Sequence, residues 1–118
     1  MSDTFYQKLT ANRHHIHQHP EVSEKEYNTT RFIKEQLQNI GIEPLDYPLK
    51  TGVIAEIGHG YPIIALRADI DALPIFEKTG LAYASDNGAM HACGHDFHQT
   101  SLLGAAERLK QQEATLKG

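Results

Sequence analysis

The residues best suited to chemistry lie within 90–100, a stretch that holds the only cysteine and three of the eight histidines in the 118-residue chain. Cys93 and His95 are two positions apart, and Gly94 between them lets the backbone turn without a Cβ clash. A thiolate and an imidazole at this spacing can reach one borderline-soft metal ion. Asp96 follows where a helical pattern begins, and helix N-termini favour carboxylates.

Cys93 also has interpretations without a metal. A lone cysteine is commonly a small buried hydrophobe, and histidines are commonly polar surface residues. Cys93 with a histidine base would instead make a cysteine hydrolase. A chelator would leave that enzyme active, whereas alkylation would abolish its activity. A third interpretation is a non-catalytic binding module with at most one weak metal site.

A second candidate segment is the apolar run 63–68, which is followed by two acids, Asp69 and Asp71. Open α/β sheets place their ligands at the carboxyl ends of strands. Side chains two apart in an extended chain point the same way, so one acid can face a metal while the other lies beside it. Capping of the loop is the simpler role for both acids.

Hydrophobic periodicity predicts three helices, two strands and one long loop. The helices are expected at 3–19, 24–40 and 96–112, the strands at 53–57 and 63–68, and the irregular loop at 75–90. Gly58 to Pro62 separates the two strands, which predicts a hairpin.

Local signals set the expected helix ends and buried faces. Thr4 with Gln7 can cap the first helix, Ser23 with Glu26 resembles a capping box, and Gly41 is the expected C-terminal cap. The buried stripe of the third helix is predicted at Leu102, Ala105, Ala106 and Leu109.

Composition limits the function classes. The net charge is −4 and 40% of the residues are hydrophobic, as in ordinary globular domains. Without a basic run, neither nucleic acid nor an anionic membrane is an expected partner. Apolar runs stop at four residues, too short for a membrane span. A single cysteine makes no internal disulfide, which fits a reducing cytoplasm.

Three short motifs resemble one enzyme family. His17–Glu21 reads His-Gln-His-Pro-Glu, Arg67–Pro74 reads Arg-Ala-Asp-Ile-Asp-Ala-Leu-Pro, and His91–Asp96 reads His-Ala-Cys-Gly-His-Asp. Together they resemble the amidohydrolase branch of the M20 metallopeptidases, which includes hippurate hydrolases, N-acetyl-diaminopimelate deacetylases and auxin-conjugate hydrolases. The motifs occur in the family's order, and the resemblance spans about the whole chain.

The resemblance implies a fold and an activity. It implies an α/β protein, with residues 1–118 forming the N-terminal part of a three-layer α/β/α zinc-peptidase-like catalytic domain. The implied reaction is metal-dependent hydrolysis of N-acyl amino acids or related small amides. It also implies two divalent ions, zinc or manganese with cobalt or nickel as alternatives, and a homo-oligomeric parent enzyme.

The resemblance also implies residue roles. Cys93 and His95 are the expected metal ligands, and Asp71 is the expected catalytic acid that orients the metal assembly. Three further side chains are expected to support the ligands: Asp69, Asp96 and His98.

The resemblance does not extend to every motif of the family. M20 enzymes carry a Glu-Glu pair and later histidine ligands that these 118 residues lack, so the chain alone is expected not to hydrolyse amides.

Four histidines cluster in the first predicted helix. His14 and His15 are interpreted as a polar face near the helix C-terminus, and His17 and His19 are not predicted to be ligands although they fall in the first motif.

Overall fold

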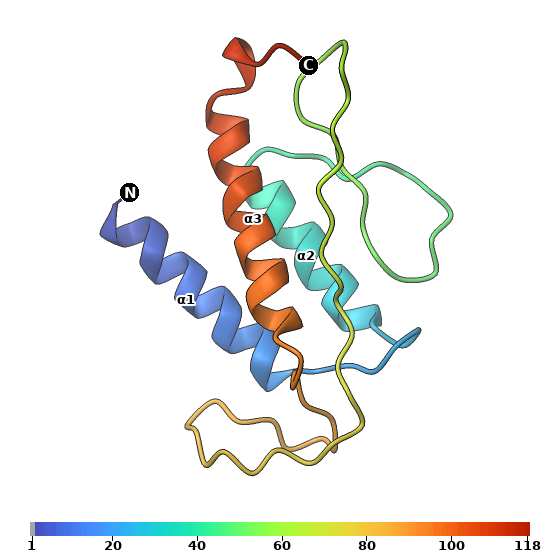
Figure 1. Ribbon diagram of the computed structural model, residues 1–118, viewed down its shortest axis with the longest axis vertical. Coiled ribbons are helices and arrows are strands. Elements are labelled where there is room, and N and C mark those ends of the chain that lie inside the picture. The colour runs from blue at the N-terminus through green and yellow to red at the C-terminus, as the bar shows by residue number, and fades with distance from the viewer. Residues whose placement is uncertain (1) are drawn as a thin grey trace.

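The computed structural model describes residues 2–118 and places three helices side by side among long irregular segments (Figure 1). The helices are α1 (Asp3–Gln18), α2 (Tyr27–Asn39) and α3 (His95–Gln111), and a 3-10 turn, η1, spans Glu113–Thr115. The three predicted helices are therefore confirmed to within three residues at each end. Helix α3 packs against both α1 and α2. None of the described helices is long and apolar enough to cross a membrane.

At the N-termini of α1 and α2, the capping residues differ from the predicted pairs, Thr4 with Gln7 and Ser23 with Glu26. The hydroxyl of Ser2 accepts from the backbone N–H of Phe5 and caps α1. The predicted capping box of Ser23 and Glu26 is wrong, because α2 begins at Tyr27 without a side-chain hydrogen bond from its N-cap residue.

The N-terminus of α2 is instead capped from outside the helix by Glu21. Its carboxylate accepts from the backbone N–H of Thr29 at 2.6 Å and from the Thr29 hydroxyl at 2.7 Å. The same carboxylate is 3.3 Å from the backbone nitrogen of Asn28. At the other end, the predicted role of Gly41 is confirmed, since it follows the last turn with φ +84°.

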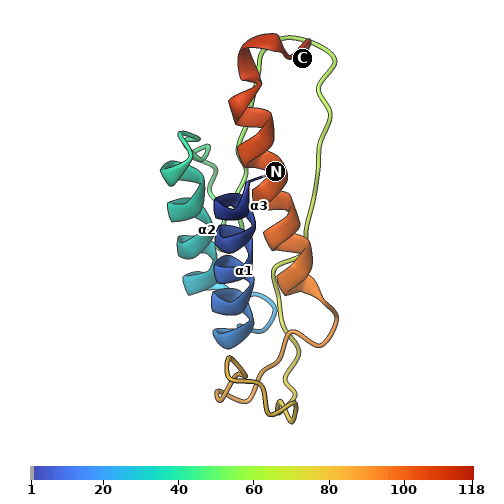
Figure 2. The same cartoon turned by 90° about the vertical axis from the view of Figure 1, so that its left-hand side faces the viewer.

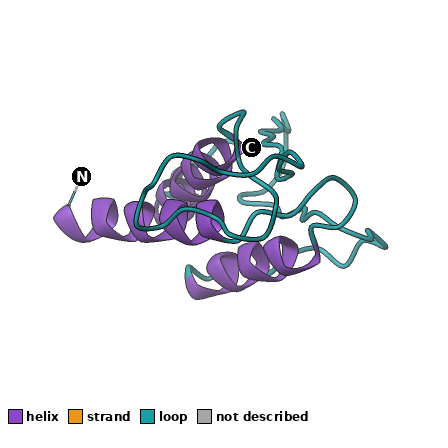
Figure 3. Ribbon diagram, turned by 90° about the horizontal axis from the view of Figure 1, so that it is seen from below, coloured by secondary structure: helices purple, strands orange, loops and turns teal. Residues whose placement is uncertain are grey.

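The predicted hairpin of 53–57 and 63–68 is wrong. Figure 3 shows helices and loops but no strand in residues 2–118, where the pairing consists of isolated bridges. Segment 63–68 runs apart from the helices (Figure 2), and the exposed fraction reaches 71% at Ile63 and 81% at Ile64. A strand requires backbone partners on a neighbouring segment. The expected α/β layering is therefore not confirmed in the described chain.

The hydrophobic core lies between α2, α3 and the segment after α2. Its buried members are Ile33, Leu37, Ile42 and Leu103, and Val53, Ala55 and Ile57 pack against them. Segment 53–57 thus contributes side chains to the core without forming a strand. The extended segments enlarge the molecule, since its radius of gyration is 15.0 Å, against about 13 Å for a compact chain of this length.

The buried face of α3 lies one position away from the predicted stripe. Its buried residues are Asp96, Gln99, Thr100, Leu103 and Gly104. The predicted residues Leu102, Ala105, Ala106 and Leu109 are only partly buried, and of these Ala106 packs against the core. The physical reason is that α3 is covered by helices on two sides, and its first turns bury polar side chains that an apolar pattern does not mark.

Candidate metal centre

His95 is the first residue of α3 and is fixed by the segment that carries Asp71. Its Nδ1 lies 2.8 Å from the backbone oxygen of Asp71 and 3.1 Å from the Asp71 carboxylate. Both partners are acceptors, so the proton resides on Nδ1. Gly94 precedes His95 as the N-cap residue with φ +79°, a conformation that glycine adopts without the steric cost of a Cβ.

The second nitrogen of the His95 ring is placed to bind a metal. Nε2 has no hydrogen-bond donor near it among the described residues, and its nearest charged neighbour is the Asp69 carboxylate at 3.8 Å. Asp69 is itself paired with the exposed guanidinium of Arg67. With the proton held on Nδ1, the lone pair of Nε2 is available to a metal ion.

Two backbone bridges bring the aspartate motif and the cysteine motif together. Leu73 and Met90 exchange two backbone hydrogen bonds, each 2.9 Å long. Ala72, directly after Asp71, donates from its backbone to the oxygen of Glu21 at 2.8 Å. These short bridges, rather than a regular sheet, hold the three motifs at one end of the helices.

Cys93 and His98 lie at the exposed side of this region. Cys93 is a free, exposed cysteine. His98 is exposed as well, and its ring centre is 5.8 Å from that of His95. Neither ring nitrogen of His95 has the Cys93 thiol as a hydrogen-bond partner in the described chain.

The donor set fits part of a metal site. Residues 2–118 contain no group of three or more His, Cys, Asp or Glu side chains arranged to hold an ion. Cys93 and His95 offer the sulfur and nitrogen donors that zinc prefers. A metal here would therefore take its other ligands from water or from another polypeptide segment.

The Asp96 side chain does not point toward the candidate metal ligands. It faces the helix bundle. Its side chain is 1% exposed. One carboxylate oxygen accepts from the backbone N–H of Phe97 at 3.0 Å, and the other accepts from Nε of Arg13 at 2.9 Å and from Nδ1 of His17 at 2.8 Å. Asp96 thus joins the first turn of α3 to α1.

His91 is buried beside the same groups. It is 4% exposed, and neither of its ring nitrogens has a hydrogen-bond partner among the described residues. Burial lowers the pKa of His91, although the charges of Asp96 and Asp71 oppose that effect. Burial therefore favours the neutral form of this ring, which lies between the ligand loop and the bundle.

The histidines of α1 separate into surface residues and one buried residue. His14 stacks on Tyr83 and His15 stacks on Phe32, so these two are surface aromatic contacts, while His17 is 3% exposed. Sequence reasoning missed the importance of His17. The available signal was its place in the first motif and its spacing of four from Arg13, which puts both side chains on one helix face.

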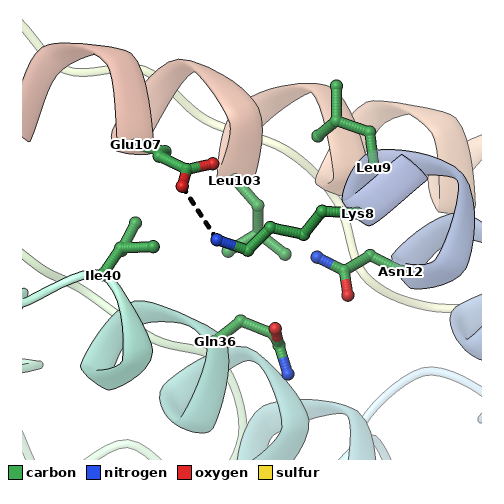
Figure 4. Close-up of a pocket in the computed structure, with 7 residues that line it drawn as sticks. All are labelled: Lys8, Leu9, Asn12, Gln36, Ile40, Leu103 and Glu107. Carbon is green, nitrogen blue, oxygen red and sulfur yellow. Dashed lines mark hydrogen bonds and ion pairs between the residues drawn. The ribbon is translucent and has the colours of Figure 1, made fainter. Parts of the chain in front are cut away.

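The hollow between the three helices does not coincide with the candidate centre. It is lined by Lys8, Leu9, Asn12, Gln36, Ile40, Leu103 and Glu107 (Figure 4). An ion pair between Lys8 and Glu107, 2.8 Å long, closes part of it. No residue of the three motifs is among those lining residues.

Comparison with known proteins gives a consistent result. The family model "Peptidase family M20/M25/M40" matches residues 65–118. The N-acetyl-L-cysteine deacetylase of Bacillus subtilis is 56% identical over 98% of this chain, and a second N-acetylcysteine deacetylase from that species is 53% identical over 97%. The chain spans 28% and 31% of the lengths of these two relatives.

Solved structures agree with the sequence matches. A dinuclear metal-binding peptidase of the M20 family from Bacillus subtilis superposes with a TM-score of 0.96 at 52% identity, covering 99% of this chain and 34% of that one. A putative aminohydrolase from methicillin-resistant Staphylococcus aureus superposes with a TM-score of 0.85 at 39% identity, covering 98% of this chain and 32% of that one. The motifs, the geometry around His95 and these matches all agree with peptidase family M20/M25/M40, whose model matches residues 65–118 of this chain.

Proposed function

We propose that this chain is the ligand-bearing part of a metal-dependent amidohydrolase that cleaves N-acyl amino acids into a carboxylic acid and a free amino acid. The observation that carries the proposal is the orientation of His95. Its Nδ1 is held by Asp71, and its Nε2 is free to bind a metal two residues from the exposed Cys93. The similarity to two N-acetylcysteine deacetylases supports the reaction class.

Each residue has a defined part in this proposal. Cys93 and His95 are ligands in a centre of two divalent ions, zinc or manganese. Such ions supply a nucleophilic water at neutral pH and polarise the scissile carbonyl. Asp71 accepts a hydrogen bond from the Nδ1–H group of His95 and so keeps the ring in the tautomer that binds metal. Asp69 and His98 border the same ring.

The substrate proposed first is an N-acetylated amino acid, with N-acetylcysteine as the compound to test. Hydrolysis adds water across the amide bond, so that the acyl carbon gains a hydroxyl and the amine leaves with a proton. The substrate is a small molecule, and we also propose a cytoplasmic setting, because a thiolate ligand remains reduced there.

The test is hydrolysis by the full-length protein, measured as release of free amine from N-acetylcysteine, N-acetylmethionine and hippurate. Activity should disappear with a chelator and return when zinc, manganese or cobalt is added. Activity that survives chelation but is abolished by thiol alkylation would instead identify a cysteine hydrolase. The 118-residue polypeptide assayed in parallel should release no amine, because residues 2–118 hold no three-ligand cluster.

A further inference from the structure

The buried His17 lies between two carboxylates from distant parts of the chain. Its Nδ1 is 2.8 Å from Asp96, 79 residues along the sequence, and its Nε2 is 2.9 Å from Glu77, 60 residues along. The Glu77 side chain is 0% exposed and that of Asp96 is 1% exposed. The ring is therefore enclosed by charged partners and shielded from water.

The carboxylate of Glu77 is surrounded by donors. Burial alone would raise its pKa, but donation from the backbone N–H of Ser85, from the Thr79 hydroxyl and from His17 outweighs burial and lowers the pKa to about 2. On the His17 ring, each nitrogen faces a carboxylate, Asp96 at Nδ1 and Glu77 at Nε2. A hydrogen bond to an ionised carboxylate is stronger than one between neutral groups.

A guanidinium completes the cluster. Arg13, one turn before His17 on α1, donates from Nε to Asp96 at 2.9 Å and from Nη1 to the hydroxyl of Tyr83 at 2.8 Å. The two buried carboxylates are thus contacted by the Arg13 guanidinium and the His17 ring. Removing either Arg13 or His17 leaves a buried carboxylate without one of its partners, which is costly.

The cluster joins three segments at the end of the molecule where the ligand loop lies. His17 belongs to α1, Asp96 to the first turn of α3, and Glu77 to the loop 75–90 (Figure 1). Asp96 directly follows His95, and its other oxygen accepts from the backbone N–H of Phe97. The orientation of Asp96 therefore fixes the backbone from which His95 projects.

We infer that His17 is a positioning residue for the metal centre, acting through Asp96 on the backbone of the ligand segment 93–97. This inference rests on the proposed function, in which Cys93 and His95 bind metal. His17 contacts neither ligand. It sets how rigidly the backbone of residues 93–97, which carries both ligands, is held. Loss of a residue that supports metal ligands typically weakens metal affinity ~10–100-fold.

The test combines two measurements on the full-length protein. The first is cobalt binding, followed by ligand-field and sulfur-to-cobalt absorption. The second is hydrogen exchange at the Phe97 amide in the metal-free protein. His17→Gln should weaken cobalt binding at least ~10-fold, shift the cobalt absorption and speed exchange at Phe97. His15→Gln is the matched control, because His15 is an exposed histidine on the same helix that stacks on Phe32, and it should change none of these.

The outcomes separate this inference from the proposed function. Folded His17→Gln protein with wild-type cobalt affinity, spectrum and Phe97 exchange would overturn the positioning role while leaving the metal centre intact. Wild-type protein that binds no cobalt through Cys93 would overturn the proposed function, and the Phe97 exchange would still decide whether His17 holds the segment. If His17→Gln does not fold, Glu77→Gln replaces it: faster Phe97 exchange supports the inference, and wild-type exchange overturns it.

Discussion

Nδ1 of the His95 ring has two acceptors on Asp71: the backbone oxygen at 2.8 Å and the carboxylate at 3.1 Å. The backbone contact is independent of the side chain at position 71. The carboxylate adds a second acceptor to a bond that the backbone already makes, so the position of the ring does not depend on the carboxylate alone.

Asp71→Asn should therefore lower the hydrolytic rate of the full-length protein ~10–100-fold without unfolding it. The fold is retained because the backbone oxygen still accepts from His95. Steady-state kinetics over a range of pH, with circular dichroism as the folding check, measure this. Asp86→Asn is the control, since Asp86 is an exposed acid in the 75–90 loop. An unchanged rate and an unchanged pH profile would remove Asp71 from the site.

Cys93→Ala should reduce the metal content of the purified full-length protein, because it deletes the exposed thiol of a proposed ligand two residues before His95 and would leave a bound metal with fewer protein ligands. Elemental analysis after dialysis against metal-free buffer gives the metal content directly. Ser101→Ala changes another exposed small polar residue on the adjoining helix and should leave the metal content unaltered. Full metal occupancy and full rate in the cysteine variant would refute its assignment as a ligand.

The ionisation of Glu77 makes the stability of the fold depend on pH in the acid range. Its pKa falls from an ordinary 4.5 to about 2 in the folded protein. Because the folded pKa is the lower one, its stabilisation is complete above pH 4.5 and is lost as the pH falls toward 2.

Glu77→Gln should thus reduce the free energy of unfolding at neutral pH, by about 1–3 kcal/mol for a lost charged hydrogen-bond partner. It should also flatten the dependence of that free energy on pH between 4.5 and 2. Urea unfolding at a series of pH values measures both. Glu107→Gln disrupts the more exposed pair with Lys8 and should cost less. The same acid dependence in the Glu77 variant and the wild type would contradict this account.

Glu21 caps α2 from the preceding segment, and Glu21→Ala should destabilise the protein by about 1–2 kcal/mol, as loss of a helix cap does. The variant leaves the N–H groups of Asn28 and Thr29 without their carboxylate acceptor. Thermal unfolding and the helical circular dichroism signal report the loss. Glu35→Ala removes an exposed acid within the same helix, so equal destabilisation by both variants would argue against the capping role.

Local sequence signals sufficed for the helices because those signals act over one or two turns. The apolar spacing of α2, in which Ile33 and Leu37 are buried, and the glycine at position 41 gave its position and its end. The candidate ligand motif was equally local, because Cys93, Gly94 and His95 are consecutive and their chemistry depends on residue type. Strands at 53–57 and 63–68 were also predicted from local pattern, which says nothing about where the backbone partners of a strand would come from.

The sequence by itself thus determined three helices, the ligand-type residues Cys93 and His95, and the family that their motifs resemble. Only the tertiary structure decided that His17 joins Asp96 and Glu77, which are 79 and 60 residues away, and that His95 Nδ1 is turned to Asp71. The physical reason is that a charged side chain has the same local pattern whether it is solvated or buried. Its role is set by which opposite charge the fold brings within hydrogen-bonding distance.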